Sequence, residues 1–573
     1  MNSKIVYHLF VNPFWIILLM CGLNLWLMHY SIMINCQMDA IIDWTAFLDN
    51  FVGVSFDVII LLFFFQVIFK GNNNYSLGAC FFITWIWSFT NIIYSRFFYH
   101  YLSFSAVSQS SSLFDGIVIK CIVNSFRFED FLYICIFVFF VYLIRIPIQR
   151  NKQYLKKALT YLCVVVFIDL GGHALFCVST PELRYVNYYI HRLNVSHFNN
   201  GMYFSQPIYA NFIRGALRSI VPEVILSLQG EMDLTGEQIH AINSIIDSPR
   251  TYRADNSGLK LPKNIIFILV ESYMSFTSDM KVGNNEVTPF LNTLKQDSLV
   301  YYNVSMKENV TIGESSDGQF IYMTGLLPLR SMITVSKAKR ISLPGLPKIL
   351  GMKSRMVIPT VASMWNQDEM CQHYGFDNLY TSKDYEGGRY ESLTDEQLFD
   401  LAIQKDKGLQ QPFFSVILTM SMHQPYVNQI DPTFPVDETT MSKDLACYLN
   451  ACHYTDSQIK RYFDHLKQVG LYDNSLIVIA ADHRVHNVQF GDVSDDIPLY
   501  IVNVMGLKKE MWKGDCNQID VYITLLDLMR CKSKWHGLGH SLVSSDYQNS
   551  VTEQLWDVSE WIVLGDFFSR QSN

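Results

Sequence analysis

The chain is poor in charged residues. Only 17% of its 573 residues are Asp, Glu, Lys or Arg, against about 25% in an ordinary soluble domain. This deficit and the net charge of -8 exclude a disordered chain and a protein that coats nucleic acid, because both classes are rich in charge. The deficit is uneven, since residues 1–179 hold only 18 of the 44 basic and 52 acidic residues. The first third is therefore suited to lipid and the remainder to water.

The sequence also lacks a cysteine framework, although it contains 12 cysteines. Seven of them lie in or beside apolar stretches, where cysteine behaves as a small apolar residue. The other five show no zinc-ribbon spacing, and Cys516–Cys531 is the first candidate for a single bridge. These five are Cys371, Cys447, Cys452, Cys516 and Cys531.

Long apolar runs fill the amino-terminal third. A helix that crosses a bilayer needs about 20 mostly apolar residues. No small-residue cleavage site follows the first run, so we interpret it as an uncleaved anchor rather than a signal peptide. Five stretches meet the requirement: Phe14–Ile32, Phe51–Phe69, Leu77–Tyr94, Phe128–Ile146 and Leu159–Val178.

The charged residues of the loops predict the orientation. Four basic residues between 150 and 157 follow the fourth stretch, whereas three aspartates between 39 and 49 follow the first. Because Lys and Arg mark the cytoplasmic side, the amino terminus is predicted inside and the chain beyond about residue 180 outside. Asp57, Asp169 and His173 fall within predicted spans, where ionisable groups form interhelical hydrogen bonds or serve a function such as headgroup binding.

The carboxy-terminal part has the pattern of an α/β domain. Continuous apolar runs at Asn264–Val270, Phe413–Thr419 and Ser475–Ala481 are typical of strands buried on both faces. Helical stretches such as Pro289–Asp297 and Tyr454–Val469 lie between them. This alternation predicts a mostly parallel sheet covered on both sides. We therefore expect a membrane domain at 1–179, a linker at 180–260 and a catalytic domain at 261–573.

Polar residues follow each of the three predicted strands. Glu271 follows the first, His423 lies just beyond the second, and Asp482 and His483 follow the third. A single carboxylate after a strand is often a helix cap, but open α/β sheets bind ligands beyond the carboxyl ends of their strands. Carboxylate and imidazole ligands suit zinc or manganese, with magnesium as a further candidate. We therefore predict one divalent metal ion.

A hydroxyl group is available in the segment Gly313-Glu-Ser-Ser-Asp-Gly-Gln-Phe320. A small-residue turn before an apolar segment can present a serine at a helix amino terminus, where backbone amides favour an anion. Metal coordination would activate such a serine and stabilise charge on a phosphoryl oxygen. The segment alone leaves open whether Ser315 or Ser316 is simply a helix cap.

In order and spacing, these motifs resemble the lipoteichoic acid synthase-like branch of the sulfatase and alkaline phosphatase superfamily. That branch has five amino-terminal spans followed by an extracytoplasmic sulfatase-like domain. The matching stretches are Val270-Glu-Ser-Tyr, Thr288-Pro-Phe-Leu, Gly313–Phe320, Trp365–Met370 with Tyr374-Gly-Phe376, His453-Tyr-Thr-Asp456, Gly470–Ser475, Ala481-Asp-His483 and Gln518-Ile-Asp520.

The resemblance implies roles for individual residues. It implies metal ligands at Glu271, Ser315, Asp482 and His483, with Ser315 as nucleophile where the family usually has threonine. It places His423 on the substrate phosphate and Trp365 in the headgroup pocket. His423 and His453 both remain candidates for the general base, and Arg484 either binds substrate phosphate or is paired structurally. True sulfatases carry proline two residues and arginine four residues after the modified residue, and Ser315 lacks both.

The resemblance implies a metal-dependent transferase that moves a phosphoglycerol or phosphoethanolamine headgroup from a phospholipid to a surface glycan or lipid. The site would lie on the outer face of the cytoplasmic membrane, at the periplasm or cell surface. An extracytoplasmic phosphodiesterase or sulfuric-ester hydrolase is the alternative. A catalytically inactive scaffold is a third hypothesis, which the presence of all four ligand residues disfavours.

The headgroup pocket departs from the family pattern. Where those enzymes carry a histidine and an arginine, this chain has Ile358 and Gln367. Losing a fixed cation removes charge-assisted hydrogen bonds worth about 1.5–3 kcal/mol each. We therefore expect activity that is not restricted to phosphatidylglycerol and includes phosphatidylethanolamine as a candidate donor, unless Arg355 or Arg484 supplies the missing charge.

Overall fold

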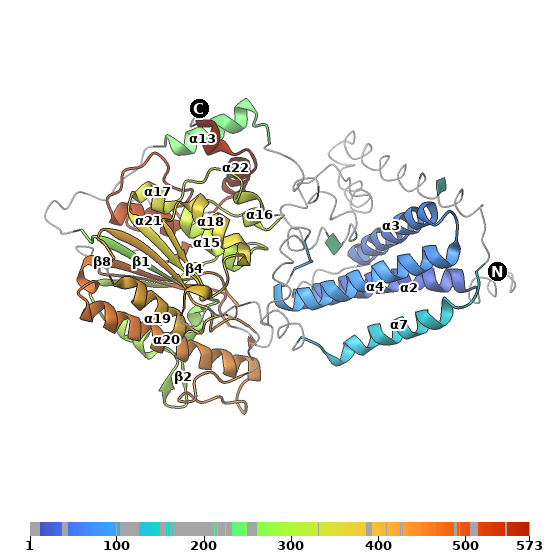
Figure 1. The fold of residues 1–573 in the computed structure, drawn as a ribbon, viewed down its shortest axis with the longest axis horizontal. Coiled ribbons are helices and arrows are strands. Elements are labelled where there is room, and N and C mark those ends of the chain that lie inside the picture. The colour runs from blue at the N-terminus through green and yellow to red at the C-terminus, as the bar shows by residue number, and fades with distance from the viewer. Residues whose placement is uncertain are drawn as a thin grey trace. The chain divides into compact units, whose positions relative to one another are not determined.

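A computed structural model gives the fold of the chain (Figure 1). The described residues form two compact units, which divide between Leu228 and Gln229. They comprise 12–36, 44–98, 100–103, 125–148, isolated positions between 156 and 224, 232–248, and 261–571 except 331, 386–391, 408, 425, 427, 486–489, 492, 505–513, 545–546 and 550.

The amino-terminal unit is built from apolar helices. The first helix begins at a proline, and Asn12 Oδ1 caps it by accepting a hydrogen bond from the Phe14 N–H at 3.0 Å. Among the described residues, three helices are long and apolar enough to cross a membrane, which agrees with the first three predicted spans. They are α2 (Pro13–Asn35), α3 (Trp44–Ile68) and α4 (Asn73–Phe98).

The prediction of five spans is not confirmed. The fourth predicted stretch forms a short 3-10 helix, η3 (Phe128–Asp130), and then α7 (Phe131–Leu143). Arg96 binds Asp130 through two 2.8 Å hydrogen bonds at the start of this segment. A helix of 13 residues rises about 20 Å, less than the roughly 30 Å apolar core of a bilayer. The fifth predicted stretch lies outside the described residues, apart from positions 159, 160 and 163.

One of the predicted intramembrane ionisable residues is visible. Asp57 of α3 is fully buried, and a Cβ atom on Gly215 would lie 2.5 Å from its Oδ2. Gly215 also has a φ of +88°, a conformation that glycine adopts without strain. The chain can therefore pack against Asp57 at this point because residue 215 is glycine. Asp169 and His173 lie outside the described residues.

The carboxy-terminal unit contains an eight-stranded, mostly parallel sheet, as predicted (Figure 1). The strand β9 runs antiparallel to both of its neighbours, β8 and β4, whereas the other paired strands of this sheet run parallel. Its order is β10 (Cys516–Asn517), β4 (Val300–Lys307), β9 (Ile497–Val502), β8 (Ser475–Ala481), β1 (Asn264–Val270), β7 (Phe413–Leu418), β5 (Lys353–Val357) and β6 (Asn378–Tyr380).

The centre of the sheet is the three strands that the apolar runs predict. The strands β8, β1 and β7 lie side by side, and almost every residue in them is buried. Their registers pair Val270 with Ala481 and Leu269 with Leu418. Their carboxyl ends therefore meet at one edge of the sheet.

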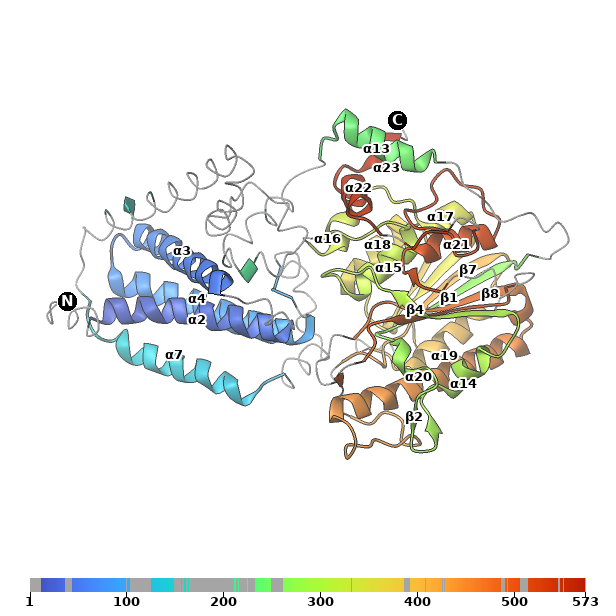
Figure 2. The same ribbon diagram turned by 180° about the vertical axis from the view of Figure 1, so that it is seen from behind.

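Helices cover both faces of the sheet (Figures 1 and 2). One layer contains α15 (Ser315–Thr324), α17 (Leu346–Leu350), α18 (Gln367–Tyr374) and α21 (Asp520–Leu528), and the other contains α14 (Pro289–Leu294), α19 (Asp395–Asp406) and α20 (Lys443–Gln468). The remaining elements are α13 (Gly236–Ile246), α16 (Thr334–Ala338), α22 (Glu553–Leu564), α23 (Phe567–Gln571), β2 (Lys281–Val282), β3 (Asn285–Glu286), η4 (Ser275–Thr277), η5 (Met364–Asn366), η6 (Ser382–Asp384) and η7 (Tyr472–Asn474).

Part of the predicted linker packs against the carboxy-terminal unit. The helix α13 contacts α22, and the Met232 N–H donates to the Leu564 carbonyl at 2.8 Å. The domain limits at 179 and 260 stay predictions.

The predicted Cys516–Cys531 bridge is wrong, since neither cysteine forms a disulfide bond. Cys516 is buried in the edge strand β10, whereas Cys531 follows the end of α21 and its thiol lies 3.6 Å from the Ile349 carbonyl. The two side chains thus belong to separate surroundings, which their spacing in the sequence does not reveal.

Candidate functional site

The site lies where β1, β7 and β8 end. Glu271, Asp482 and His483 follow directly after β1 and β8 and are buried. The Glu271 N–H donates to Thr419 Oγ1, just beyond β7, at 3.0 Å. The Asp482 N–H donates to the Val270 carbonyl at 3.1 Å. The second bond extends the pairing of β1 and β8 by one residue, and both bonds fix the backbone that carries the two carboxylates.

A tight turn after Glu271 joins the two carboxylates. Ser272 has a φ of +51°, and this turn directs its N–H to Asp482 Oδ1 at 2.8 Å. Its hydroxyl group donates to Glu271 Oε1 at 2.6 Å. Ser272 therefore binds a carboxylate from each strand and holds the pair together.

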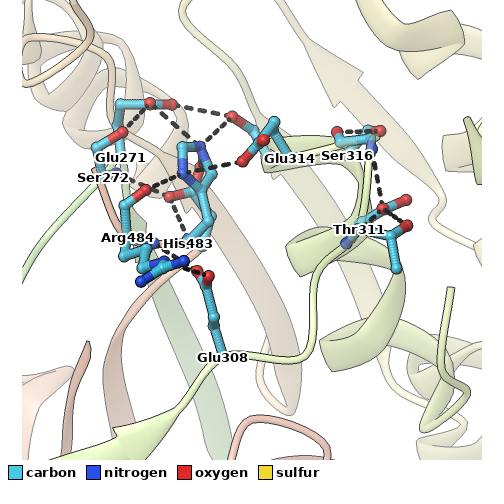
Figure 3. Close-up of polar contacts among 12 residues, drawn as sticks. Glu271, Ser272, Glu308, Thr311, Glu314, Ser316, His483 and Arg484 are labelled. Carbon is cyan, nitrogen blue, oxygen red and sulfur yellow. Dashed lines mark hydrogen bonds and ion pairs between the residues drawn. The ribbon is translucent and has the colours of Figure 1, made fainter. Parts of the chain in front are cut away.

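The hydroxyl group of Ser315 points into this cluster. Its Oγ donates to Glu271 Oε2 at 3.2 Å and lies 3.1 Å from His483 Nε2. The neighbouring Ser316 instead donates to the Gly313 carbonyl at 2.7 Å, within its own turn (Figure 3). The structure thus distinguishes the two serines, and Ser315 is the one that lies in the cluster.

The backbone before Ser315 is strained. Glu314 is the residue before the first turn of α15, with a φ of +45° and a ψ of -119°. Such a conformation costs a non-glycine residue about 1–3 kcal/mol and is concentrated at functional sites. Asp317 stabilises this turn, because its carboxylate accepts hydrogen bonds from the Thr311 and Gly313 N–H groups. This strained turn places Ser315 as the first residue of the helix α15.

The helix α15 approaches the end of β8 very closely. A Cβ atom on Gly318 would lie 2.2 Å from the Asp482 carbonyl oxygen. On the other side, Gln518 Nε2 donates to the same oxygen at 2.6 Å. The absence of a side chain at residue 318 therefore allows Ser315 to reach the carboxylates.

The cluster concentrates negative charge in a buried space. Burial raises the pKa of Asp482, Glu271 adds to that rise, and the pKa reaches about 7. Burial alone would lower the pKa of His483, but Asp482, Glu271 and Glu314 raise it to about 10. Burial also raises the pKa of Glu314 to about 8. These raised pKa values show that the cluster stabilises an added positive charge.

A divalent metal ion fits this donor set. Ligand atoms of Glu271, Asp482 and His483 all lie within 4.8 Å of one another. His483 Nδ1 lies 2.7 Å from the Arg484 carbonyl oxygen, so donation there leaves Nε2 free as a ligand atom. Two carboxylates and one imidazole could hold a divalent ion, and Ser315 Oγ lies against the same atoms.

The two candidate base histidines occupy different surroundings. His423 lies close enough to Glu271 that the pKa of this carboxyl, which burial alone would raise, is lowered by His423 and His483 to below its ordinary value. His423 Nδ1 lies 2.6 Å from the Gln424 carbonyl oxygen. His453 instead pairs with Asp431 at 2.7 Å and stacks on Phe434. Of the two, His423 is the one with an electrostatic effect on the cluster.

The two arginines that were considered as sources of positive charge are paired with carboxylates. Arg484 binds Glu308 at 2.8 Å and also pairs with Asp495 (Figure 3). Arg355 is buried and pairs with Asp406, and its Nε donates to Ser415 at 2.9 Å. Both guanidinium groups are therefore balanced by acidic partners from the protein itself.

The predicted headgroup residues lie along one segment. Trp365 is partly exposed in η5 and has a φ of +51°. Gln367 begins α18 but is 96% buried, and its amide exchanges two hydrogen bonds with Gln319 of α15. Ile358 is also buried. Sequence reasoning did not identify Glu314 or Gln319, although both lie in the quoted segment 313–320.

The comparisons with known proteins agree with one another. Residues 263–529 match the family model described as Sulfatase. The chain is 30% identical over 318 residues to lipoteichoic acid synthase 2 of Bacillus subtilis, covering 50% of this chain and 48% of that protein. It is 27% identical over 496 residues to lipoteichoic acid synthase 1 of the same species, covering 81% of this chain and 74% of that protein.

The coverage differs between these relatives. The chain spans about half the length of the first and about three quarters of the second. The solved structure of the lipoteichoic acid synthase LtaP from Listeria monocytogenes is 19% identical, with a TM-score of 0.46, covering 58% of this chain and 98% of that one. This likeness is too loose to bear on details of the site.

Proposed function

Because this chain is a lipoteichoic acid synthase-like member of the sulfatase and alkaline phosphatase superfamily, we propose that it is a phospholipid headgroup transferase. It would take a phosphoglycerol or phosphoethanolamine group from a membrane lipid and transfer it to a glycan or lipid outside the cytoplasmic membrane. The single observation that carries this proposal is the position of Ser315 Oγ, 3.2 Å from Glu271 Oε2 and 3.1 Å from His483 Nε2.

Ser315 acts as the nucleophile in this proposal. Its Oγ forms a bond to the headgroup phosphorus while the bond from phosphorus to the diacylglycerol oxygen breaks. The serine proton passes to the departing diacylglycerol. In the second half, a hydroxyl oxygen of the acceptor bonds to phosphorus while the bond from phosphorus to Ser315 Oγ breaks, and the acceptor's proton passes to Ser315 Oγ. The amino end of α15, directly beside Ser315, favours the anionic phosphoryl group.

Glu271, Asp482 and His483, with Ser315 Oγ, would hold one divalent ion, for which manganese and zinc are the leading candidates and magnesium a further one. When bound, this ion would lower the pKa of the serine hydroxyl and stabilise charge on the phosphoryl oxygens. Ser272 keeps the two carboxylates in place through its N–H and its hydroxyl group. Gln518 and Gly318 keep the Asp482 backbone against α15.

We assign the proton transfers to His423. Its Nδ1 donates to the Gln424 carbonyl, so in the neutral ring Nε2 is the nitrogen that accepts a proton. Trp365 would contact the headgroup. The membrane helices would keep the site close to its lipid donor and raise the effective donor concentration.

The pocket has little unbalanced positive charge to offer an anionic donor. Arg355 and Arg484 are paired with carboxylates, and Lys339, which binds Asn366 beside Trp365, is paired with Glu369. An ammonium-bearing headgroup therefore meets no free cation among these three side chains. We propose that phosphatidylethanolamine serves as donor alongside phosphatidylglycerol.

The test is a donor and acceptor assay with purified enzyme. Vesicles containing either phosphatidylglycerol or phosphatidylethanolamine as the sole donor are incubated with and without a glycan or glycolipid acceptor. We expect diacylglycerol release from both lipids and a headgroup on the acceptor. Strict dependence on phosphatidylglycerol would contradict the pocket argument. Release of free headgroup phosphate at an equal rate without acceptor would identify a hydrolase instead.

A further inference from the structure

The turn that carries Trp365 is held in an unfavourable backbone conformation. Trp365 has a φ of +51° and a ψ of +25°, and Asn366 has a φ of +52° and a ψ of +40°. Non-glycine residues rarely adopt the left-handed region, so two in succession are energetically unfavourable. Such a turn persists only when the surrounding structure determines it.

Side chains from two different helices hold this turn. Gln367, the residue after the turn, forms a reciprocal amide pair with Gln319 of α15. Gln319 Nε2 donates to Gln367 Oε1 at 3.1 Å, and Gln367 Nε2 donates to Gln319 Oε1 at 2.8 Å. On another side, Lys339 Nζ donates to Asn366 Oδ1 at 2.9 Å and pairs with Glu369 at 3.0 Å.

The amide pair is buried, so each amide depends on the other for its hydrogen bonds. Gln319 has 0% and Gln367 has 4% of its surface exposed, so water does not substitute for a lost partner. Gln319 Nε2 also lies 3.1 Å from the sulfur of Met356 in β5. A buried amide without its partner is costly. The two glutamines therefore fix α15 and the Trp365 turn to each other.

Gln319 and the nucleophile lie on the same helix. Ser315 and Gln319 are four residues apart, so they lie on one face of α15, about 6 Å apart along its axis. The chain of contacts thus runs from Ser315 along one helical turn to Gln319, across the amide pair to Gln367, and directly into the turn of Asn366 and Trp365.

We infer that the Gln319–Gln367 pair fixes the position of the headgroup-binding turn at Trp365 relative to the nucleophile Ser315. This inference rests on the proposed function, because it takes Trp365 as a headgroup contact. Gln367 is then a positioning residue. Its amide binds Gln319, and its effect on the donor is exerted through Trp365 on one side and Ser315 on the other.

Two substitutions at Gln367 separate positioning from other roles. Gln367→Leu removes the pair at every pH. In Gln367→Glu, a protonated carboxyl group has the shape and the hydrogen-bonding pattern of an amide. It can donate its O–H to Gln319 Oε1 and accept from Gln319 Nε2, whereas the ionised form cannot donate. Burial raises the pKa of such a carboxyl group, so the pair is restored as the pH falls.

The readout is kcat and KM for diacylglycerol release from defined donor vesicles, each divided by the wild-type value at the same pH. This ratio removes the titration of groups common to both proteins, including Glu369 and the metal-binding residues. We expect Gln367→Leu to lose about tenfold in kcat/KM at both pH values, as for a lost buried hydrogen-bonded pair. Gln367→Glu is expected to approach wild type at about pH 5.5 and to fall about tenfold at about pH 8.

The matched control is Asp368→Asn, since Asp368 is the next residue of α18 but is exposed. It should retain wild-type kcat and KM at both pH values. If Gln367→Leu does not fold, the pH dependence of the kcat/KM ratio of Gln367→Glu tests the positioning role. Gln319→Glu changes the other partner of the pair and should show the same pH dependence.

A ratio for Gln367→Glu that is the same at both pH values would overturn the positioning role, as would wild-type kinetics of Gln367→Leu. These outcomes differ from failure of the proposed function. In that case the wild-type enzyme itself would release no diacylglycerol from either phosphatidylglycerol or phosphatidylethanolamine vesicles.

Discussion

At the scale of single residues, the chemistry depends on which hydroxyl group faces the carboxylates. Ser315 and Ser316 carry the same hydroxyl group, but consecutive residues of a helix point in directions about 100° apart, so Ser315 faces the carboxylates and Ser316 does not. The sequence predicted Glu271, Asp482 and His483 as neighbours because each follows a buried strand. It could not predict the amide partner of Gln367, since that contact depends on how α15 and α18 pack.

The metal ligands give a prediction at this scale. Asp482→Ala and His483→Ala should each lose most of a bound divalent ion that the wild-type protein holds at about one per chain. Removing either residue takes one donor from a three-residue group. Elemental analysis of purified proteins measures the effect.

His453→Ala is the control for metal content, because His453 pairs with Asp431 and Phe434 away from the cluster. It should keep the ion. Full occupancy in both the Asp482 and His483 variants would refute the ligand assignment.

At the scale of elements, apolar patterning predicted the strands well and the helices less well. The strands β1, β7 and β8 lie where continuous apolar runs indicated, because burial on both faces demands such runs. The helix α20 begins at Lys443, eleven residues before the predicted start at Tyr454. Ser442 caps its start with its hydroxyl group, and the seven consecutive residues Ala446–Cys452 are all buried. Residues buried on every side show no helical periodicity in the sequence, so the pattern did not reveal these turns.

The close approach of α15 to β8 gives the second prediction. Gly318→Ala should destabilise the protein by about 1–3 kcal/mol, as overpacking does, and should weaken metal binding. The added methyl group would lie 2.2 Å from the Asp482 carbonyl oxygen, so α15 or the end of β8 must move. Thermal unfolding with and without a chelator measures both effects.

Gly236→Ala is the matched control for this substitution. Gly236 is also in the first turn of a helix, and a Cβ atom there would meet nothing within 4 Å. The free energy of unfolding of Gly236→Ala should differ little from that of the wild-type protein. Equal effects of the two substitutions would show that the contact between Gly318 and Asp482 is not specific.

At the scale of the whole molecule, the composition correctly divided the chain into a membrane part and an α/β part. In the part of the chain that the structure describes, three helices meet the length and hydropathy of a span, and the family match covers the strands of the sheet domain. The fourth predicted span is not confirmed, because α7 ends after 13 residues. Apolar composition alone does not show where a helix stops, and here η3 and the Arg96–Asp130 pair precede a short helix.

Membrane topology gives the third prediction. A reporter fused after about residue 155 should stay in the cytoplasm, whereas one fused near residue 200 should be exported. The basic residues between 150 and 157 should hold the first fusion point inside. Activity of an export-dependent reporter at both positions measures this. The reverse pattern would place the α/β domain in the cytoplasm and remove the case for surface chemistry.

The central claim is that Ser315 carries the headgroup as a covalent intermediate. Purified enzyme is incubated with a phospholipid labelled in its headgroup phosphate, quenched with acid, and digested for peptide mapping by mass spectrometry. Ser316→Ala serves as the control, because Ser316 Oγ binds the Gly313 carbonyl. The account predicts label on the peptide containing Ser315 in wild type and in Ser316→Ala, and none in Ser315→Ala. Labelling that persists in Ser315→Ala would contradict it.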